Sequence, residues 1–172
     1  MAIASFFAGR YSSTYTAPAG AALDMGITED GIKLSVAHEK EAIDRSDAYG
    51  AMLVDSVYQG ISRCQLELTA LEYKTGLLTA VLPYNAMAAS GNTTLSPGVI
   101  GRLDSAVAGG IVLTSTTSTP AVSAPATLTA TYAIISRGFD INWVYSSKLR
   151  RIPARWDVLA YLDTTVKFLV AT

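Results

Sequence analysis

The chain has 172 residues, of which 50% are hydrophobic and only 16% are charged, and its formal net charge is −1. This length fits one domain, and the near-neutral charge excludes a global basic field that would attract nucleic acid. Ordinary soluble domains are about 25% charged. The low value predicts a large core or much surface buried between subunits, and so short a chain favours the second.

Residues that carry chemistry are scarce. There is one histidine, His38, and one cysteine, Cys64, and between residues 75 and 136 the only charges are Arg102 and Asp104. Enzymes concentrate such groups where protons or nucleophiles must be handled. We therefore expect no catalytic site and no cofactor, and no second His or Cys is available to complete a metal site. An assembly protein ranks above a catalyst.

Residues 1–22 are interpreted as an N-terminal arm. Its apolar residues precede its first basic residue, Arg10, which is the wrong order for a signal peptide. Residues 11–17 alternate Tyr, Ser and Thr and predict a short strand, which Pro18-Ala19-Gly20 ends. No window offers about 18 uninterrupted apolar residues, so we expect no membrane span.

The next segments predict short strands joined by turns. Asp30-Gly31 is a strong turn signal, and a strand follows over residues 32–38 with His38 beside its apolar face, where a structural role is favoured over a ligand role. Residues 39–46 continue as a charged strand or loop, and residues 47–50 predict a turn. The apolar positions of the strand at residues 32–38, which we expect in a core, are Ile32, Leu34 and Val36.

A short strand over residues 57–59 leads into a predicted turn at Gly60. Residues 63–73 alternate most regularly and predict a strand with one inward face. Cys64 belongs to that face, so we interpret it as a small core residue rather than a nucleophile. The inward positions are Cys64, Leu66, Leu68 and Ala70.

Residues 74–87 are the best helix candidate, with an apolar stripe, and Pro83 should stop the helix near Leu82. A second short helix is expected over residues 98–107. Further strands are predicted at residues 111–113, 127–135, 138–145, 148–156 and 166–170, and residues 114–126 form a flexible hairpin tip. Pro153 suits an edge or bulged strand. The count indicates a single domain over residues 1–172, a mainly-β two-sheet sandwich or barrel with a flanking α-helix.

Two patterns suggest other functions. Glu39 and Glu41 lie two residues apart, and paired carboxylates can hydrolyse glycosides, but an interfacial or solvated strand edge is favoured because nothing else builds a sugar site. A basic segment adjoins aromatic residues, a combination that can bind single-stranded nucleic acid. Intersubunit salt bridges are favoured at this net charge. The segment contains Lys148, Arg150, Arg151 and Arg155, with Trp143, Tyr145 and Trp156 nearby.

Several short segments follow one another in a familiar order. Ile27-Thr28-Glu29-Asp30-Gly31, Asp47-Ala48-Tyr49-Gly50 and Val54 to Gly60 resemble the "TEDG", "D.YG" and "D.VYQG" stretches of tail-tube (major tail) proteins of long-tailed bacteriophages. Ser146 to Pro153 is similar to their "SS.LR.vP" segment. The resemblance spans most of residues 23–163.

This resemblance implies a fold related to the ring proteins of contractile tails and of type VI secretion. It implies that six copies form a ring and that stacked rings form a tube through which genomic DNA passes without specific binding. The implied partners are further copies of the chain and other tail proteins, such as a sheath, terminator or tape measure protein. The implied location is the virion tail, assembled in the host cytoplasm. The rival hypothesis is a virion decoration or host-recognition module.

Charge placement suggests the contacts. Acids exceed bases over residues 24–74, and bases exceed acids from residue 137 onward. We predict intersubunit contacts made by Arg150, Arg151 and Arg155 with acids that include Asp44 and Asp47, as well as Glu39 and Glu41. Because DNA carries about one charge per 1.7 Å of axis, a channel should be lined by small, polar or acidic side chains. The candidates share one face of a strand: Lys33, Ser35, Ala37, Glu39 and Glu41.

Overall fold

The computed structural model describes residues 11–46, 52–84, 100–115, 127–140, 142 and 151–171, without the side chains of residues 30, 43–46 and 52–55. These residues form short strands, two long strands and two short helices, which confirms the mainly-β class with a flanking helix. The elements are β1 (Tyr11–Thr16), β2 (Ala22–Asp24), β3 (Thr28–Ser46), β4 (Met52–Ala70), α1 (Thr75–Val81), α2 (Asp104–Val107), β5 (Gly109–Ser115), β6 (Thr127–Ile135), β7 (Ile152–Val158), β8 (Tyr161–Leu162), β9 (Val166–Lys167) and β10 (Leu169–Ala171).

Eight strands form one antiparallel sheet in the order β2-β1-β5-β6-β7-β4-β3, and β10 also pairs with β6. The first half of β6 pairs with β10 and its last three residues pair with β7, so two strands share one edge of β6. β8 and β9 pair with each other in a second, two-stranded sheet. Neither described helix has the length or apolar character that a membrane crossing requires.

One cluster of buried side chains draws on β1, β4, β5, β6, β7 and α1, so the large sheet curves around a single core. Trp156 of β7 is fully buried, and its indole Nε1–H donates a hydrogen bond of 3.0 Å to the carbonyl of Ala80 in α1. This bond satisfies the one polar group of a large apolar side chain. It ties the helix to the sheet. The helix ends at Val81, two residues before Pro83, close to the predicted stop.

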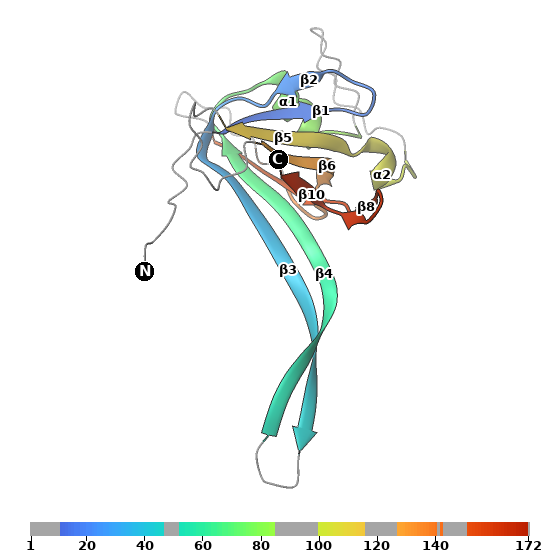
Figure 1. Cartoon of the computed structure of the whole chain (residues 1–172). Helices are drawn as coiled ribbons and strands as arrows, with labels where there is room; N and C mark the ends of the chain where they lie inside the picture. The colour runs from blue at the N-terminus through green and yellow to red at the C-terminus, as the bar shows by residue number, and fades with distance from the viewer. Residues whose placement is uncertain are drawn as a thin grey trace.

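The strands β3 and β4 depart most from expectation. Each has 19 residues, and Figure 1 shows them leaving the rest of the molecule as a long, twisted, two-stranded hairpin. The predicted turns at Asp30-Gly31 and Gly60 are wrong. Gly31 (φ 79°) lies at a register shift inside β3, and Gly60 (φ 141°) lies inside β4. Both glycines supply positive φ angles within strands that continue.

Other expectations hold in part. The strand at residues 127–135 is confirmed as β6, the helix at residues 98–107 shortens to α2, and the last strand is divided into β9 and β10. Gly138 lies in a turn, and the rest of the predicted strand at residues 138–145 is not a strand where it is described. β7 pairs with β4 on one side and β6 on the other, so it is an interior strand. Pro153 lies beyond the three residues of β7 that pair with β6, so no residue of β6 needs the N–H that proline lacks.

Of the expected N-terminal arm, residues 11–16 form β1 in the sheet, and residues 1–10 lie outside the described residues. Of the expected hairpin tip, Thr114 and Ser115 belong to β5, and residues 116–126 lie outside the description. The predicted turn at residues 47–50 lies outside it as well.

Candidate assembly surface

The five channel candidates occupy alternate positions of β3, which places them on one face of the strand. Lys33 is opposite Glu67 on β4, and Ser35 is opposite Gln65. The alternate residues of β4, such as Leu66, are buried in the core. The channel candidates therefore share the face that points away from the core, which we call the outer face. The alternation that the sequence predicted for β3 is present.

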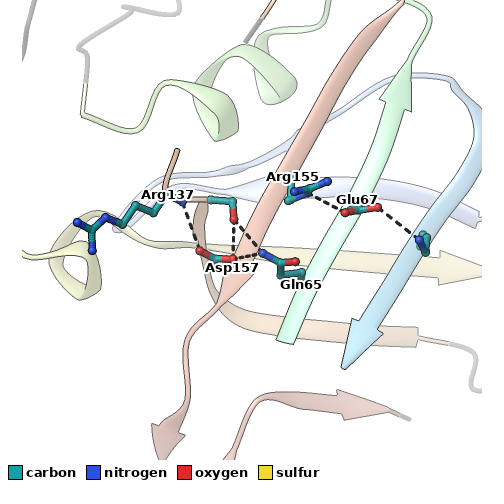
Figure 2. A network of polar contacts seen from close by, with 7 residues as sticks. Gln65, Glu67, Arg137, Arg155 and Asp157 are labelled. Atoms are coloured by element: carbon teal, nitrogen blue, oxygen red, sulfur yellow. Dashed lines mark hydrogen bonds and ion pairs between the residues drawn. The ribbon is translucent and has the colours of Figure 1, made fainter. Parts of the chain in front are cut away.

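Polar contacts join β3, β4 and β7 across this outer face. Glu67 lies between two cations, with Oε2 3.7 Å from Lys33 Nζ and Oε1 2.7 Å from Arg155 Nε (Figure 2). All three residues are direct cross-strand neighbours. Opposite charges at such positions stabilise a sheet modestly. The row carries one positive charge in excess.

A second row lies beside the first and is more buried. Gln65 Nε2 donates hydrogen bonds to Asp157 Oδ1 at 2.7 Å and to Ser136 Oγ at 3.0 Å, and Ser136 Oγ donates to the same carboxylate oxygen at 2.7 Å (Figure 2). The backbone N–H of Arg137 also reaches Asp157, at 3.4 Å. Gln65 and Ser136 are each 7% exposed. Buried polar groups that satisfy one another hold strands in one register.

A small open hollow of about 250 Å³ adjoins the two rows, lined by residues that include Lys33, Glu67, Phe139, Pro153 and Arg155. The Arg155 guanidinium lies 5.6 Å from the centre of the Phe139 ring, a cation–π distance. No group of three or more metal-ligating side chains occurs in the described part of the chain. The arrangement offers electrostatic and apolar contact.

Beyond Gln65, β4 no longer pairs with β7, and from there β3 and β4 pair only with each other. We call the segments at residues 36–46 and 52–64 the arm. β3 is the terminal strand of the sheet, so its outer edge pairs with no described strand. At about 3.3 Å per residue, a 19-residue strand is roughly 60 Å long. Such an edge is a site where further strands or chains attach.

Apolar side chains are exposed along this edge and on the arm. Leu34 and Val36 are 41% and 40% exposed, although their cross-strand partners Leu66 and Cys64 lie in the core. The expectation that Leu34 and Val36 are core residues is therefore wrong, because no described strand pairs with the outer edge of β3. Ile32 does pack against the core. Val57 and Tyr58 are about half exposed on the arm.

Three of the predicted intersubunit residues have partners inside the chain. Arg151 forms an ion pair with Glu29, and Arg155 forms one with Glu67. Glu41 accepts a hydrogen bond of 2.6 Å from Gln59 Nε2. Arg150 and Asp47 lie outside the described residues, and Asp44 lies in β3 without a described side chain.

Several predicted residues have other surroundings than expected. Trp156 is fully buried, so it offers no face on which a base can stack; Trp143, Tyr145 and Lys148 lie outside the described residues. Cys64 is in the core as predicted, and burial raises the pKa of its thiol. His38 is exposed on the arm, with its ring centre 5.7 Å from that of Tyr58.

The sequence patterns do not predict the buried row of Gln65, Ser136 and Asp157. These residues come from three separate segments, and Gln65 occupies an outward position of a strand, where a polar residue predicts exposure. The one available signal is an uncharged polar residue within the regularly alternating strand at residues 63–73.

A second polar contact lies away from the arm. The Tyr84 hydroxyl donates to Asp104 in α2, and burial together with this carboxylate raises the pKa of Tyr84 to about 12. Tyr84 also packs against a small apolar cluster of Val107, Ala108 and Ile134. The contact therefore holds the short helix against β6.

No family model and no curated protein matches the chain. Among solved structures, a chain of the PVC sheath-tube complex of an extracellular contractile injection system, in its extended state, aligns with 93% of this chain and 88% of that chain. The TM-score is 0.43 and the sequence identity is 10%. This likeness is too distant to assign a family or a function.

Proposed function

We propose that the chain is a structural subunit of a bacteriophage tail tube, in which copies associate side by side into stacked, hexameric rings around a channel for DNA. The observation that carries this proposal is the arm formed by β3 and β4. The low charge of the chain and the order of its short motifs support the same role.

The arm is poorly suited to exist alone. An isolated two-stranded hairpin is marginally stable in water. The outer edge of the arm pairs with no described strand, and the arm exposes apolar side chains, including Val57 and Tyr58. Proteins usually cover such edges or protect them with charged residues, proline or bulges. A second copy of the chain provides a surface of the same low charge, so we propose that the arm lies against a neighbouring subunit.

The shape of the molecule favours rings or tubes over a closed dimer. An arm on one copy that contacts the body of the next makes an interface between two different surfaces. Interfaces of this kind repeat until the rotation closes a ring, or they continue as a helical filament. Stacked rings form a tube, and so does a helical filament whose axis is open.

The proposed channel lining is the outer face of β3. Glu39 and Glu41 are exposed there, Ser35 and Ala37 are partly buried, and Lys33 lies beside Glu67. The five side chains carry one negative charge in excess, and we propose that they do not bind a phosphate backbone. Arg151 and Arg155 are partly exposed beside their own acids and are proposed to contact acids of a neighbour as well.

The test is electron microscopy and sedimentation of the purified protein over a range of concentrations. We expect rings or tubes of the wild type at micromolar concentration. The variant Val57→Ser/Tyr58→Ser should lose them while its circular dichroism is unchanged. The matched control is Leu162→Ser/Val166→Ser, which removes another exposed apolar pair, on β8 and β9, and should still assemble.

Monodisperse wild-type monomers or trimers at all concentrations would contradict the proposal and favour the decoration module. Loss of assembly in both double variants would show that apolar surface in general, rather than the arm, drives association.

A further inference from the structure

Besides the register shift near Gly31, the pairing of β3 and β4 is irregular where the arm leaves the body. Ala37 pairs with Arg63 and Lys40 pairs with Tyr58, so β3 advances three residues while β4 advances five. Register shifts lie between Ala37 and His38 and between Glu39 and Lys40. The additional β4 residues are Ser62 and Gln59. We call residues 37–41 and 57–63 the elbow.

Side chains hold the elbow in its irregular form. Ser62 Oγ donates to the carbonyl of Ala37 at 3.3 Å, and Gln59 Nε2 donates to Glu41 Oε2 at 2.6 Å. Each bulged residue thus makes its own bond to the opposite strand in place of a ladder bond. The rings of His38 and Tyr58 meet at the same place.

Gly60 lies between the two bulged residues. Its φ of 141° is one that residues with a side chain rarely adopt, and a Cβ built there would meet nothing within 4 Å. Glycine is therefore required here for its backbone conformation rather than for space. Sequence and structure both specify a bend at this point.

The elbow lies at the point where the arm loses the support of the body. The pairing of β4 with β7 ends at Gln65, so the elbow begins just beyond the last part of β4 that the body supports. Bulges bend a strand and increase its local twist, and Figure 1 shows the arm strongly twisted beyond the body. β3 continues to Ser46, about 17 Å beyond the elbow, so a change of roughly 20° there moves its end by about 6 Å.

We propose that the elbow is the joint that fixes the angle between arm and body, and that this angle sets the curvature at which neighbouring copies close into a ring. The second part rests on the proposed function; the first does not. An arm held at one angle meets one surface of a neighbour, and an arm released from that angle meets several.

The position of the arm relative to the body can be measured on the monomer. Spin labels on Ala42→Cys in the arm and Ala160→Cys in the body, both exposed positions, report the distance between arm and body by pulsed electron resonance. Native Cys64 is 3% exposed and stays in place. We expect one narrow distance distribution in the otherwise unchanged protein.

Two variants disturb the elbow by different routes. Gly60→Ala strains the backbone and should shift the mean distance by about 3 Å, because Ala42 lies about 10 Å along β3 from Glu39, which pairs with Gly60. Gln59→Ala/Ser62→Ala removes the two side-chain bonds without backbone strain and should broaden the distribution. The matched control is Gly138→Ala, because Gly138 also has a positive φ (71°) with open space around it but lies in the body. It should leave the distances unchanged.

The same variants, unlabelled, are then assembled and imaged. A changed distance together with tubes of changed diameter, or with none, supports the proposal. Unchanged distances in both elbow variants would overturn the proposal that the elbow fixes the angle between arm and body. Changed distances with tubes of wild-type diameter would overturn its role in closure. If the wild type forms no tubes, the proposed function fails, and the distances alone decide whether the elbow is a joint.

Discussion

The strands β3 and β4 run through both the body and the arm, and the two regions differ in what surrounds these strands. In the body, residues 65–70 of β4 lie between β3 and β7, and the core face of β4 is buried. In the arm, each strand has only the other as a described neighbour. The body has its own core, and most described side chains of the arm are exposed. A chain divided in this way is suited to assembly.

One cross-strand pair within the body shows the same effect of neighbouring strands. Leu66 is 1% exposed and Leu34, directly opposite, is 41% exposed. Both are leucines on the same face of the same sheet. Their burial differs because β7 covers one side of β4 and nothing described covers the outer side of β3. The number of flanking strands, rather than residue type, decides which apolar side chains remain available to a partner.

The largest expected difference between body and arm is in amide hydrogen exchange. In the monomer, amides of residues 65–70 should exchange only through global unfolding, whose free energy is typically about 5–15 kcal/mol. Arm amides such as those of Ala42 and Val57 should exchange at least a thousandfold faster, because local opening there exposes little apolar surface. Mass spectrometry of the monomer checks this, and equal protection in both regions would remove the distinction.

The next largest effect concerns one aromatic residue in each region. Trp156→Ala should lower the free energy of unfolding by roughly 3–5 kcal/mol, because it leaves a cavity in the core and an unpaired carbonyl at Ala80. Tyr58→Ala on the arm should cost the monomer less than about 1 kcal/mol. Urea titration measures both. A monomer that Tyr58→Ala destabilises as much as Trp156→Ala does would show that the arm is part of the cooperative core.

A smaller effect compares two glutamines, each of which donates a hydrogen bond to a carboxylate. Gln65→Ala in the body should destabilise the protein by about 1–3 kcal/mol, because Asp157 and Ser136 lose a buried donor. Gln59→Ala, whose bond to Glu41 is exposed, should cost under about 1 kcal/mol. Thermal and urea unfolding of the two variants decide the comparison. Equal losses of unfolding free energy would mean that burial does not determine how much such a hydrogen bond contributes to stability.

The smallest expected effect appears only at alkaline pH. The folded pKa of Tyr84 is raised from the ordinary value of 10.0 to about 12, so the folded state favours the protonated phenol. This stabilisation is fully present below pH 10 and is lost as the pH rises towards 12. Tyr84→Phe should lower stability near neutral pH by about 0.5–1.5 kcal/mol, and its stability should fall less steeply above pH 10. Parallel pH profiles of the two proteins would contradict this assignment.

Local patterns in the sequence determined much of the body. The alternation of residues 63–73 correctly indicates that Cys64, Leu66, Leu68 and Ala70 are buried. Residues 127–135 form β6 with the predicted bounds, and α1 ends just before Pro83. These predictions hold because side-chain period and the missing N–H of proline act within a few residues.

Only the tertiary structure decided the arm and its surroundings. Asp30-Gly31 and Gly60 have the composition of turns, but a glycine ends a strand or bulges it according to whether the opposite strand continues beside it. Leu34 and Val36 have the pattern of core residues, but no described strand lies beyond β3, and both are exposed. The row of Gln65, Ser136 and Asp157 forms because β4, β7 and the turn after β6 meet. Each outcome depends on a neighbour that is distant in the chain, so a local pattern does not encode it.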